Sequence, residues 1–146
     1  MKVLVFGRGG QLALALRDQG AAAGHDVICL GRESLSIADA GAVADAIRTH
    51  DSDLIVNAAA YTAVDKAESD AAEAFAVNRD GTRHIAAAAH DAGIPFIHVS
   101  TDYVFDGGGE RPWQEDDATG PLGVYGASKL AGEQAMADLG PARYAI

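Results

Sequence analysis

The sequence predicts an α/β fold, a doubly wound parallel sheet of the Rossmann type, from two observations. Short apolar runs alternate with helical stretches along the whole chain, and a glycine-rich turn follows the first run at once. Strands separated by helices form parallel sheets with right-handed crossovers, and ligands bind outside the carboxyl ends of their strands. We therefore expect residues 1–146 to form one dinucleotide-binding domain.

The first strand and the glycine turn carry the earliest indication of a function. Residues 3–6 are apolar and rich in β-branched side chains, as in a strand buried on both faces, and residues 11–19 have helical composition. Between them, Gly7 and Gly10 would let the backbone approach a pyrophosphate, which would rest on the helix N-terminus. A plain structural turn is the alternative.

The second strand, residues 25–30, is followed by Gly31 and Arg32. Sites that prefer NAD often place an acid here to bind the ribose hydroxyls, whereas an arginine suits a 2′-phosphate. Arg32 therefore favours NADPH, with a solvated loop arginine as the alternative. Asp39 is a suitable N-cap for a helix over residues 40–50. Its inner face is expected to carry Val43, Ala44 and Ile47.

The middle of the chain adds one strand and a long helix. Residues 54–56 form the third strand, and small residues follow it that would let the chain pass close to a flat ligand. A helix is expected over residues 70–92, with Gly93 ending it. Asn78 and Gly81 lower helix propensity there, and such conflicts indicate close packing or a site.

The last third holds the fourth strand, residues 96–99, and a helix over residues 124–139. His98 is interpreted as a satisfied core histidine without a role. A polar loop, residues 107–123, is expected to arch over the site. Gly140 and Pro141 should end the helix, and a fifth strand should start within residues 143–146.

Tyr125 and Lys129 are candidate catalytic residues because their spacing of four places them on one helix face. A nearby ammonium lowers the pKa of a phenol and so prepares it for proton transfer. Thr101 follows the fourth strand and could hold a carbonyl oxygen beside the phenol. A packed ring beside a solvated amine is the alternative interpretation of the pair.

Composition excludes several classes of function. A formal net charge of −10 argues against affinity for nucleic acid or anionic membranes, since both need a basic surface. No apolar run is long enough to span a bilayer and no signal peptide is recognisable, so we expect a cytoplasmic location. Cys29 is expected to be buried and inert. The histidines show no metal-ligand spacing, and we expect no metal.

Three motifs resemble the dTDP-4-dehydrorhamnose reductase family of the extended short-chain dehydrogenase/reductase superfamily. They are GRGGQL at residues 7–12, AAYTAVDKAE at residues 59–68 and STDYVFDG at residues 100–107. The resemblance implies reduction of the 4-keto group of dTDP-4-dehydro-L-rhamnose to dTDP-L-rhamnose, with NADPH or NADH as cofactor, for polysaccharide biosynthesis. It also implies a nucleotide-sugar substrate, with a homodimer as a candidate assembly.

By matching position, the resemblance also assigns residues. Tyr125 would donate the proton and also contact the cofactor, Lys129 would also bind the nicotinamide ribose, and the substrate would meet Thr101, Asp102, Tyr103 and Tyr125. The other cofactor-binding residues would be Gly7, Gly10, Gln11, Leu12, Arg32, Ser36, Ile37, Ala58, Ala60, Tyr61 and Thr62. Two departures bear on cofactor preference: Ser36 replaces a common aspartate, and Gly31 replaces a common acid.

Two alternative functions remain open, and this chain is shorter than members of the family. The first alternative is a nucleotide-sugar epimerase or dehydratase of the same superfamily, and the second is a non-catalytic regulatory subunit like those of methionine adenosyltransferase. The family continues for about as many residues again, so we expect this chain to be truncated before the family's C-terminal substrate domain.

Overall fold

The computed structural model describes residues 1–139 and 143–146. Five strands form one sheet in the order β2-β1-β3-β4-β5, and every neighbouring pair is parallel. The strands are β1 (Lys2–Phe6), β2 (Asp26–Leu30), β3 (Leu54–Asn57), β4 (Phe96–His98) and β5 (Tyr144–Ala145). The predicted doubly wound parallel sheet is thereby confirmed.

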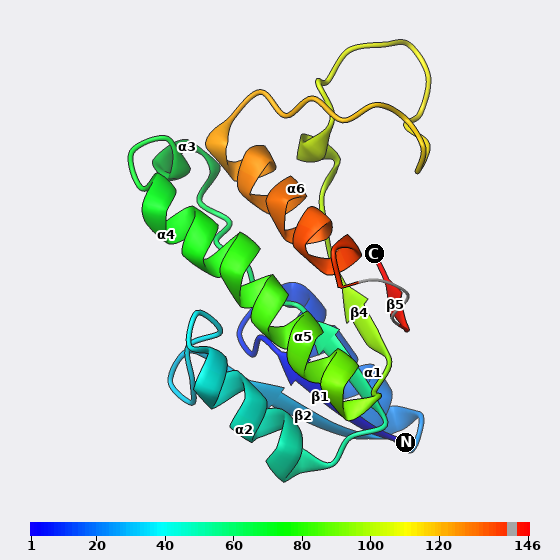
Figure 1. Ribbon diagram of the computed structural model, residues 1–146. Coiled ribbons are helices and arrows are strands. Elements are labelled where there is room, and N and C mark those ends of the chain that lie inside the picture. The colour runs from blue at the N-terminus through cyan, green and yellow to red at the C-terminus, as the bar shows by residue number, and fades with distance from the viewer. Residues whose placement is uncertain (140–142) are drawn as a thin grey trace.

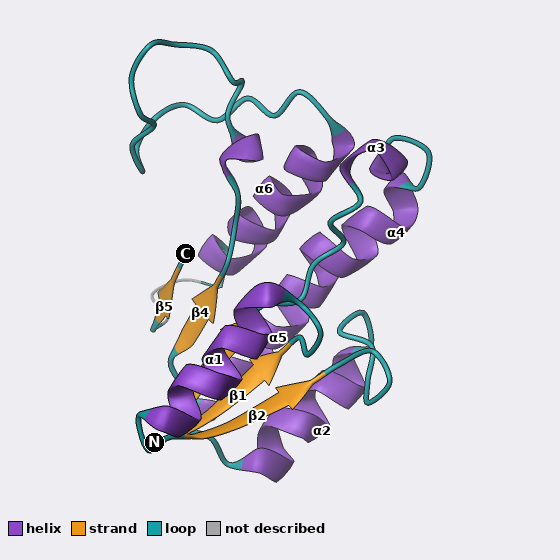
Figure 2. Ribbon diagram, turned by 180° about the vertical axis from the view of Figure 1, so that it is seen from behind, coloured by secondary structure: helices purple, strands orange, loops and turns teal. Residues whose placement is uncertain are grey.

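Helices cover the two faces of the sheet unequally. In Figure 1, α2, α5 and α6 lie in front of the sheet, and α1 lies behind it. Figure 2 shows the reverse side, with α1 toward the viewer. The helices are α1 (Gln11–Ala22), α2 (Ala40–His50), α3 (Val64–Ala67), α4 (Ala71–Phe75), α5 (Thr82–Ala92) and α6 (Val124–Ala137). Short segments are a π-helix (Ala76–Gly81) and a 3₁₀ helix (Asp102–Val104).

The alternation of side chains along the strands builds two cores. Leu4 and Phe6 of β1 face α2 and α5, whereas Val3 and Val5 join Ala13 of α1 on the other side. The α1 face is open beside β4, where Ile97 and Val99 are 38% and 42% exposed.

Cys29 is half-buried on the α1 face rather than fully buried. Its Sγ donates to the carbonyl oxygen of Ala13 at 3.7 Å, and burial raises the pKa of the thiol. A raised pKa means little thiolate at neutral pH, in line with the expected inert thiol.

The long helix expected over residues 70–92 is not one regular α-helix. The π-helical segment interrupts it between α4 and α5, and that segment contains both Asn78 and Gly81. A Cβ added at Gly81 would lie 2.6 Å from Cγ1 of Ile37. The two unfavourable residues therefore mark close packing, and Gly93 ends α5 in the left-handed conformation as predicted.

The remaining helix predictions are largely confirmed. The Asp39 side chain accepts from the backbone N–H of Ala42 at 3.0 Å and so caps α2. Val43 and Ile47 are buried, but the prediction for Ala44 was wrong: it is exposed, because Ala46, about one turn after Val43, occupies the inner position instead. The predicted stop at Gly140 and Pro141 lies outside the described residues.

No helix within residues 1–139 and 143–146 is long and apolar enough to cross a membrane.

Candidate functional site

The glycine turn lies at the switch point of the sheet, where the chain has gone from β1 outward to β2 and returned to β3. Gly7 has φ +121°, a conformation that favours glycine, and its N–H donates to the carbonyl oxygen of Leu30 at 2.7 Å. A Cβ added there would lie 3.0 Å from the carbonyl carbon of Ala58. Glycine at this position therefore lets the ends of β1 and β3 approach each other.

The N-terminus of α1 is open. Gly10 is its N-cap residue, no side chain caps the first turn, and a Cβ added at Gly10 would meet nothing within 4 Å. The first backbone N–H groups of a helix lack partners within the helix and carry positive partial charge. This end of α1 therefore offers donors and space for a phosphate group.

A cavity of about 570 Å³ extends from the glycine turn along the carboxyl ends of β1, β2 and β3. Its volume falls within the range typical of small-molecule sites. Eight of the predicted cofactor residues line it: Gly7, Gly10, Arg32, Ser36, Ile37, Ala58, Ala60 and Thr62. The structure thus gathers residues from four separate segments of the chain around one space.

Five predicted cofactor residues do not line this cavity: Tyr125 and Lys129, described below, and Gln11, Leu12 and Tyr61. Leu12 faces the apolar groove beside α1, with Val56 and Ile97, and Gln11 is exposed at the start of α1. Tyr61 packs its ring into the larger core and donates its hydroxyl to Asp70 Oδ2 at 3.2 Å. Cofactor roles for all five residues stay predictions.

Charged side chains line the rim of the cavity. Arg32 is exposed there, and nearby the guanidinium of Arg8 donates to Glu33 Oε1 at 2.6 Å. A hydrogen bond from its own backbone and the Arg8 guanidinium lower the pKa of Glu33. No role was predicted for Arg8 or Glu33. Gly31 replaces the acid common at the end of the second strand, but a carboxylate, Glu33, stands two residues later.

Asn78 fixes the chain that leaves β3. Its Oδ1 accepts from the backbone N–H of Tyr61 at 2.8 Å, and its Nδ2 donates to the carbonyl oxygen of Tyr61 at 3.1 Å and to Ser128 Oγ at 2.9 Å. It therefore ties the cavity wall to α6. A Cβ added at Gly132 of α6 would collide with the Asn78 carbonyl oxygen, so glycine permits this contact.

Tyr125 lines a second cavity of about 380 Å³, together with Asp102 and Tyr103. The rings of Tyr125 and Tyr103 meet edge to face, with centroids 5.5 Å apart. Thr101 caps the 3₁₀ helix: its Oγ1 accepts from the Tyr103 N–H at 3.3 Å and donates to Asp102 Oδ1 at 3.3 Å. The residues predicted to meet the substrate thus lie together.

The start of α6 is held by two contacts. A Cβ added at Gly126 would collide with the Tyr103 carbonyl oxygen, so glycine lets α6 approach the 3₁₀ helix. Glu68 Oε1 accepts from the backbone N–H of Val124 at 2.8 Å. Sequence reasoning missed the role of Glu68, because the two residues lie 56 positions apart.

The loop of residues 107–123 projects beyond the start of α6 rather than across the sheet (Figure 1). Phe105 and Trp113 stack with ring centroids 4.6 Å apart, and both line the Tyr125 cavity. The loop thus forms a wall of that cavity, and it does not cover the glycine turn.

Lys129 is only 2% exposed and points into the protein. Its Nζ donates to the carbonyl oxygen of Val99 at 2.6 Å and lies 3.1 Å from His98 Nε2. Burial lowers the pKa of Lys129 to about 8, against the opposing influence of Glu133. Within residues 1–139 and 143–146, no hydrogen bond joins Lys129 to the Tyr125 hydroxyl, so their direct cooperation stays a prediction.

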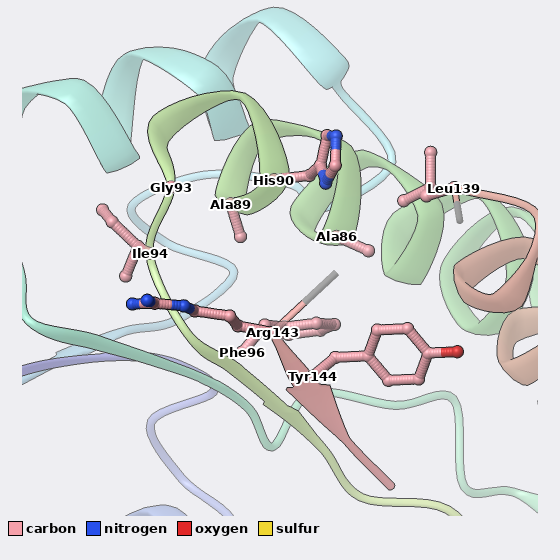
Figure 3. Close-up of a pocket in the computed structure, with 9 residues that line it drawn as sticks. All are labelled: Ala86, Ala89, His90, Gly93, Ile94, Phe96, Leu139, Arg143 and Tyr144. Carbon is pink, nitrogen blue, oxygen red and sulfur yellow. The ribbon is translucent and has the colours of Figure 1, made fainter. Parts of the chain in front are cut away.

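A third cavity, of about 400 Å³, lies between α5 and the start of β4. Figure 3 shows Arg143 and Tyr144 along one side of it and residues of α5 along the other. It is at the amino end of the strands, away from the glycine turn, and no predicted site residue lines it. In the described part of the chain, no group of three or more His, Cys, Asp or Glu side chains could hold a metal ion.

Comparisons with known proteins support one family. A family model described as the RmlD substrate binding domain matches residues 1–146. A dTDP-4-dehydrorhamnose reductase from Sinorhizobium fredii is 52% identical over 97% of this chain and 47% of its own length. The chain thus spans about half the length of the curated relatives it matches.

Comparison with solved structures supports the same family. A crystal structure of a dTDP-4-dehydrorhamnose reductase from Clostridium acetobutylicum superposes with a TM-score of 0.93 at 36% identity, over 99% of this chain and 51% of the other. The corresponding enzyme from Bacillus anthracis, solved in complex with NADP, gives a TM-score of 0.92 at 32% identity, over 98% of this chain and 51% of the other.

Proposed function

The chain belongs to the RmlD substrate binding domain family, and on that premise we propose that the protein reduces the 4-keto group of dTDP-4-dehydro-L-rhamnose to give dTDP-L-rhamnose, with NADPH or NADH as the reductant. The observation that carries the proposal is the cavity at the glycine turn. It stands at the switch point of the sheet, in a chain similar to dTDP-4-dehydrorhamnose reductases over nearly all its residues.

The residues of the cavity fit a dinucleotide. The uncapped N-terminus of α1 would receive the pyrophosphate, and Gly10 leaves it room. Arg32 at the rim would meet a 2′-phosphate, while Glu33 offers a carboxylate for ribose hydroxyls. Both types of group are therefore present, and Arg32 supports a preference for NADPH. The bound nicotinamide supplies a hydride to the carbonyl carbon.

The protein's own residues would complete the reduction at the carbonyl oxygen. Negative charge develops on this oxygen in the transition state, and a positioned acid must neutralise it. Tyr125 is the proton donor in this proposal, and the Thr101 hydroxyl adds a hydrogen bond to the same oxygen. Asp102 and Tyr103, which share the cavity with Tyr125, would orient the sugar. A homodimer and a cytoplasmic location remain predictions.

The test is an assay of the complete protein with dTDP-4-dehydro-L-rhamnose and NADPH, followed through the absorbance of the nicotinamide. We expect turnover that needs both compounds. An epimerase or dehydratase would act without net consumption of NADPH, and a regulatory subunit would show no turnover. Either result would overturn the proposal.

The cavity itself can be tested by calorimetry of NADPH binding. Gly10→Val would place a branched side chain where the pyrophosphate should lie, and we expect a loss of at least about tenfold in affinity, or ~1.4 kcal/mol. The matched control is Gly41→Val, at an exposed position of α2 that does not line the cavity. Equal affinities of the two variants would contradict the assignment.

A further inference from the structure

His98 occupies a position that the proposed reaction does not explain. It is the last residue of β4, is 1% exposed, and lies between a neighbouring strand and α6. Its Nδ1 is 3.2 Å from Asn57 Nδ2, and its Nε2 is 3.1 Å from Lys129 Nζ. One imidazole ring therefore connects the end of β3 with the lysine of the candidate site.

The orientation of the Asn57 amide follows from its other contacts. The backbone N–H of Ala59 donates to Asn57 Oδ1 at 3.1 Å, which places Nδ2 on the opposite side. There Nδ2 donates to Thr82 Oγ1 at 3.3 Å and faces His98. An amide NH₂ group only donates, so His98 Nδ1 must be the acceptor.

This contact selects the tautomer of His98. Burial, and then the charge of Lys129, lower the pKa of His98 to about 3, so the ring is neutral at pH 7. A neutral imidazole carries one proton, and with Nδ1 as acceptor that proton is on Nε2. The N–H of Nε2 therefore points toward Lys129 Nζ.

An ammonium group has three donors and no acceptor, so it would face Nε2–H donor to donor. A neutral amine has a lone pair that accepts from Nε2–H while one of its own N–H bonds donates to the Val99 carbonyl oxygen. The negative charge of Glu133 opposes this preference for the neutral amine, because it raises the pKa of Lys129. Glu133 lies on the same helix and accepts from Ser100 Oγ. The neutral amine therefore pairs with both His98 Nε2–H and the Val99 carbonyl oxygen, without two donors facing each other.

We propose that His98, oriented by Asn57, is a positioning residue that holds Lys129 in its inward position and disfavours the ammonium form of that lysine. Only one part of this inference rests on the proposed function, namely that Lys129 acts beside the nicotinamide ribose and Tyr125. The inward position held by His98 is then a resting form, and Lys129 must leave His98 to act as a cation at the site.

The test is a ¹⁵N NMR titration of the labelled protein without cofactor, which reports the protonated ring nitrogen of His98 and the charge of Lys129. We expect the His98 proton on Nε2 and titration of Lys129 below the value of about 8 that burial gives it, because the His98 donor adds to the effect of burial. In Asn57→Asp, a carboxylate would accept from Nδ1–H. The His98 proton should then move to Nδ1, and the Lys129 titration should rise above its value in the unmodified protein.

His98→Gln provides a second, independent variant. Its amide oxygen can accept from an ammonium, so the Lys129 titration should again rise above its value in the unmodified protein. The matched control is His90→Gln, at an exposed position on α5, which should leave the Lys129 titration unchanged. Both readouts are made without substrate, so absence of reductase activity would not affect them.

A His98 proton on Nδ1 in the unmodified protein would overturn the proposal, and so would an Lys129 titration that His98→Gln leaves in place. The tautomer of His98 in the unmodified protein tests the proposal even if a variant fails to fold. The proposed reductase activity would survive either result, because it does not depend on the resting form of Lys129.

Discussion

The glycine-turn cavity and the buried contacts around Lys129 differ in how far their charged groups are exposed to water. The cavity is walled by backbone and by small and apolar side chains, and the charged residues that line it, Arg8, Arg32, Glu33 and Glu73, are exposed to solvent. Lys129, His98 and Asn57 are buried at 2% exposure or less. Water screens the rim charges, so placing them there costs little stability, and they affect the preference between NADPH and NADH. Burial instead changes the ionisation of Lys129 itself.

The largest expected effect sharpens the contrast between binding and chemistry. Tyr125→Phe in the complete protein should lower the rate of reduction by ~10²–10⁴-fold, because general acid catalysis is lost, while NADPH still binds. Steady-state kinetics and calorimetry measure the two quantities. Tyr144→Phe, at the start of β5 and outside the Tyr125 cavity, is the matched control. A variant with near-normal turnover would reduce Tyr125 to a packing residue.

Lys129 provides a prediction about stability. Its pKa is lowered to about 8 in the folded protein, against ~10.4 in an unfolded chain. Between these values the unfolded state binds more protons, so the free energy of unfolding should rise with pH from about 8 to ~10.4, and the penalty is complete below about 8. Lys129→Met should therefore stabilise the protein at neutral pH, by on the order of 1–3 kcal/mol.

Urea denaturation at neutral pH and at the top of this window tests the prediction. Lys129→Met should lose the rise in stability with pH, and it should also bind NADPH more weakly. Lys66→Met, at an exposed lysine of α3, should show neither effect. A destabilised Lys129→Met at neutral pH would mean that the bond to the Val99 carbonyl oxygen outweighs the cost of burying the amine.

At the rim, Arg32→Ala should narrow the preference for NADPH over NADH by about one to two decades. A charge-assisted hydrogen bond to a phosphate contributes ~1.5–3 kcal/mol, and each tenfold change corresponds to ~1.4 kcal/mol. The ratio of kcat/KM for the two cofactors is the measurement. Arg48→Ala, on an exposed face of α2, serves as the control. An unchanged ratio would identify Arg32 as a solvated loop residue.

The smallest effect concerns the scaffold that both regions share. Asp39→Ala removes the N-cap of α2 and should lower the free energy of unfolding by ~1 kcal/mol, without changing NADPH affinity. Asp45→Ala, farther along the same helix, should cost less, because its exposed ion pair with Arg48 contributes little. Equal losses would argue against the capping role of Asp39.

Local rules predicted much of the fold and part of the site. Alternating apolar runs and helical stretches identified the strands, Asp39 and Gly93 marked helix ends, and the glycine turn indicated the cavity. They failed where the cause was distant in sequence. In the π-helical segment, Gly81 contacts Ile37 and Asn78 contacts Gly132, and both partners are distant in sequence. The spacing of four between Tyr125 and Lys129 likewise could not reveal where the Lys129 amine points.

By itself, the sequence determined the alternation of strands and helices and the glycine turn, because side-chain period, capping and backbone freedom act between near neighbours. Only the tertiary structure decided that His98 lies between Asn57 and Lys129. These three residues come from β3, β4 and α6, and only the pairing of the strands and the packing of α6 bring them together. The protonation of a buried amine depends on those neighbours, so it could not be predicted from the chain alone.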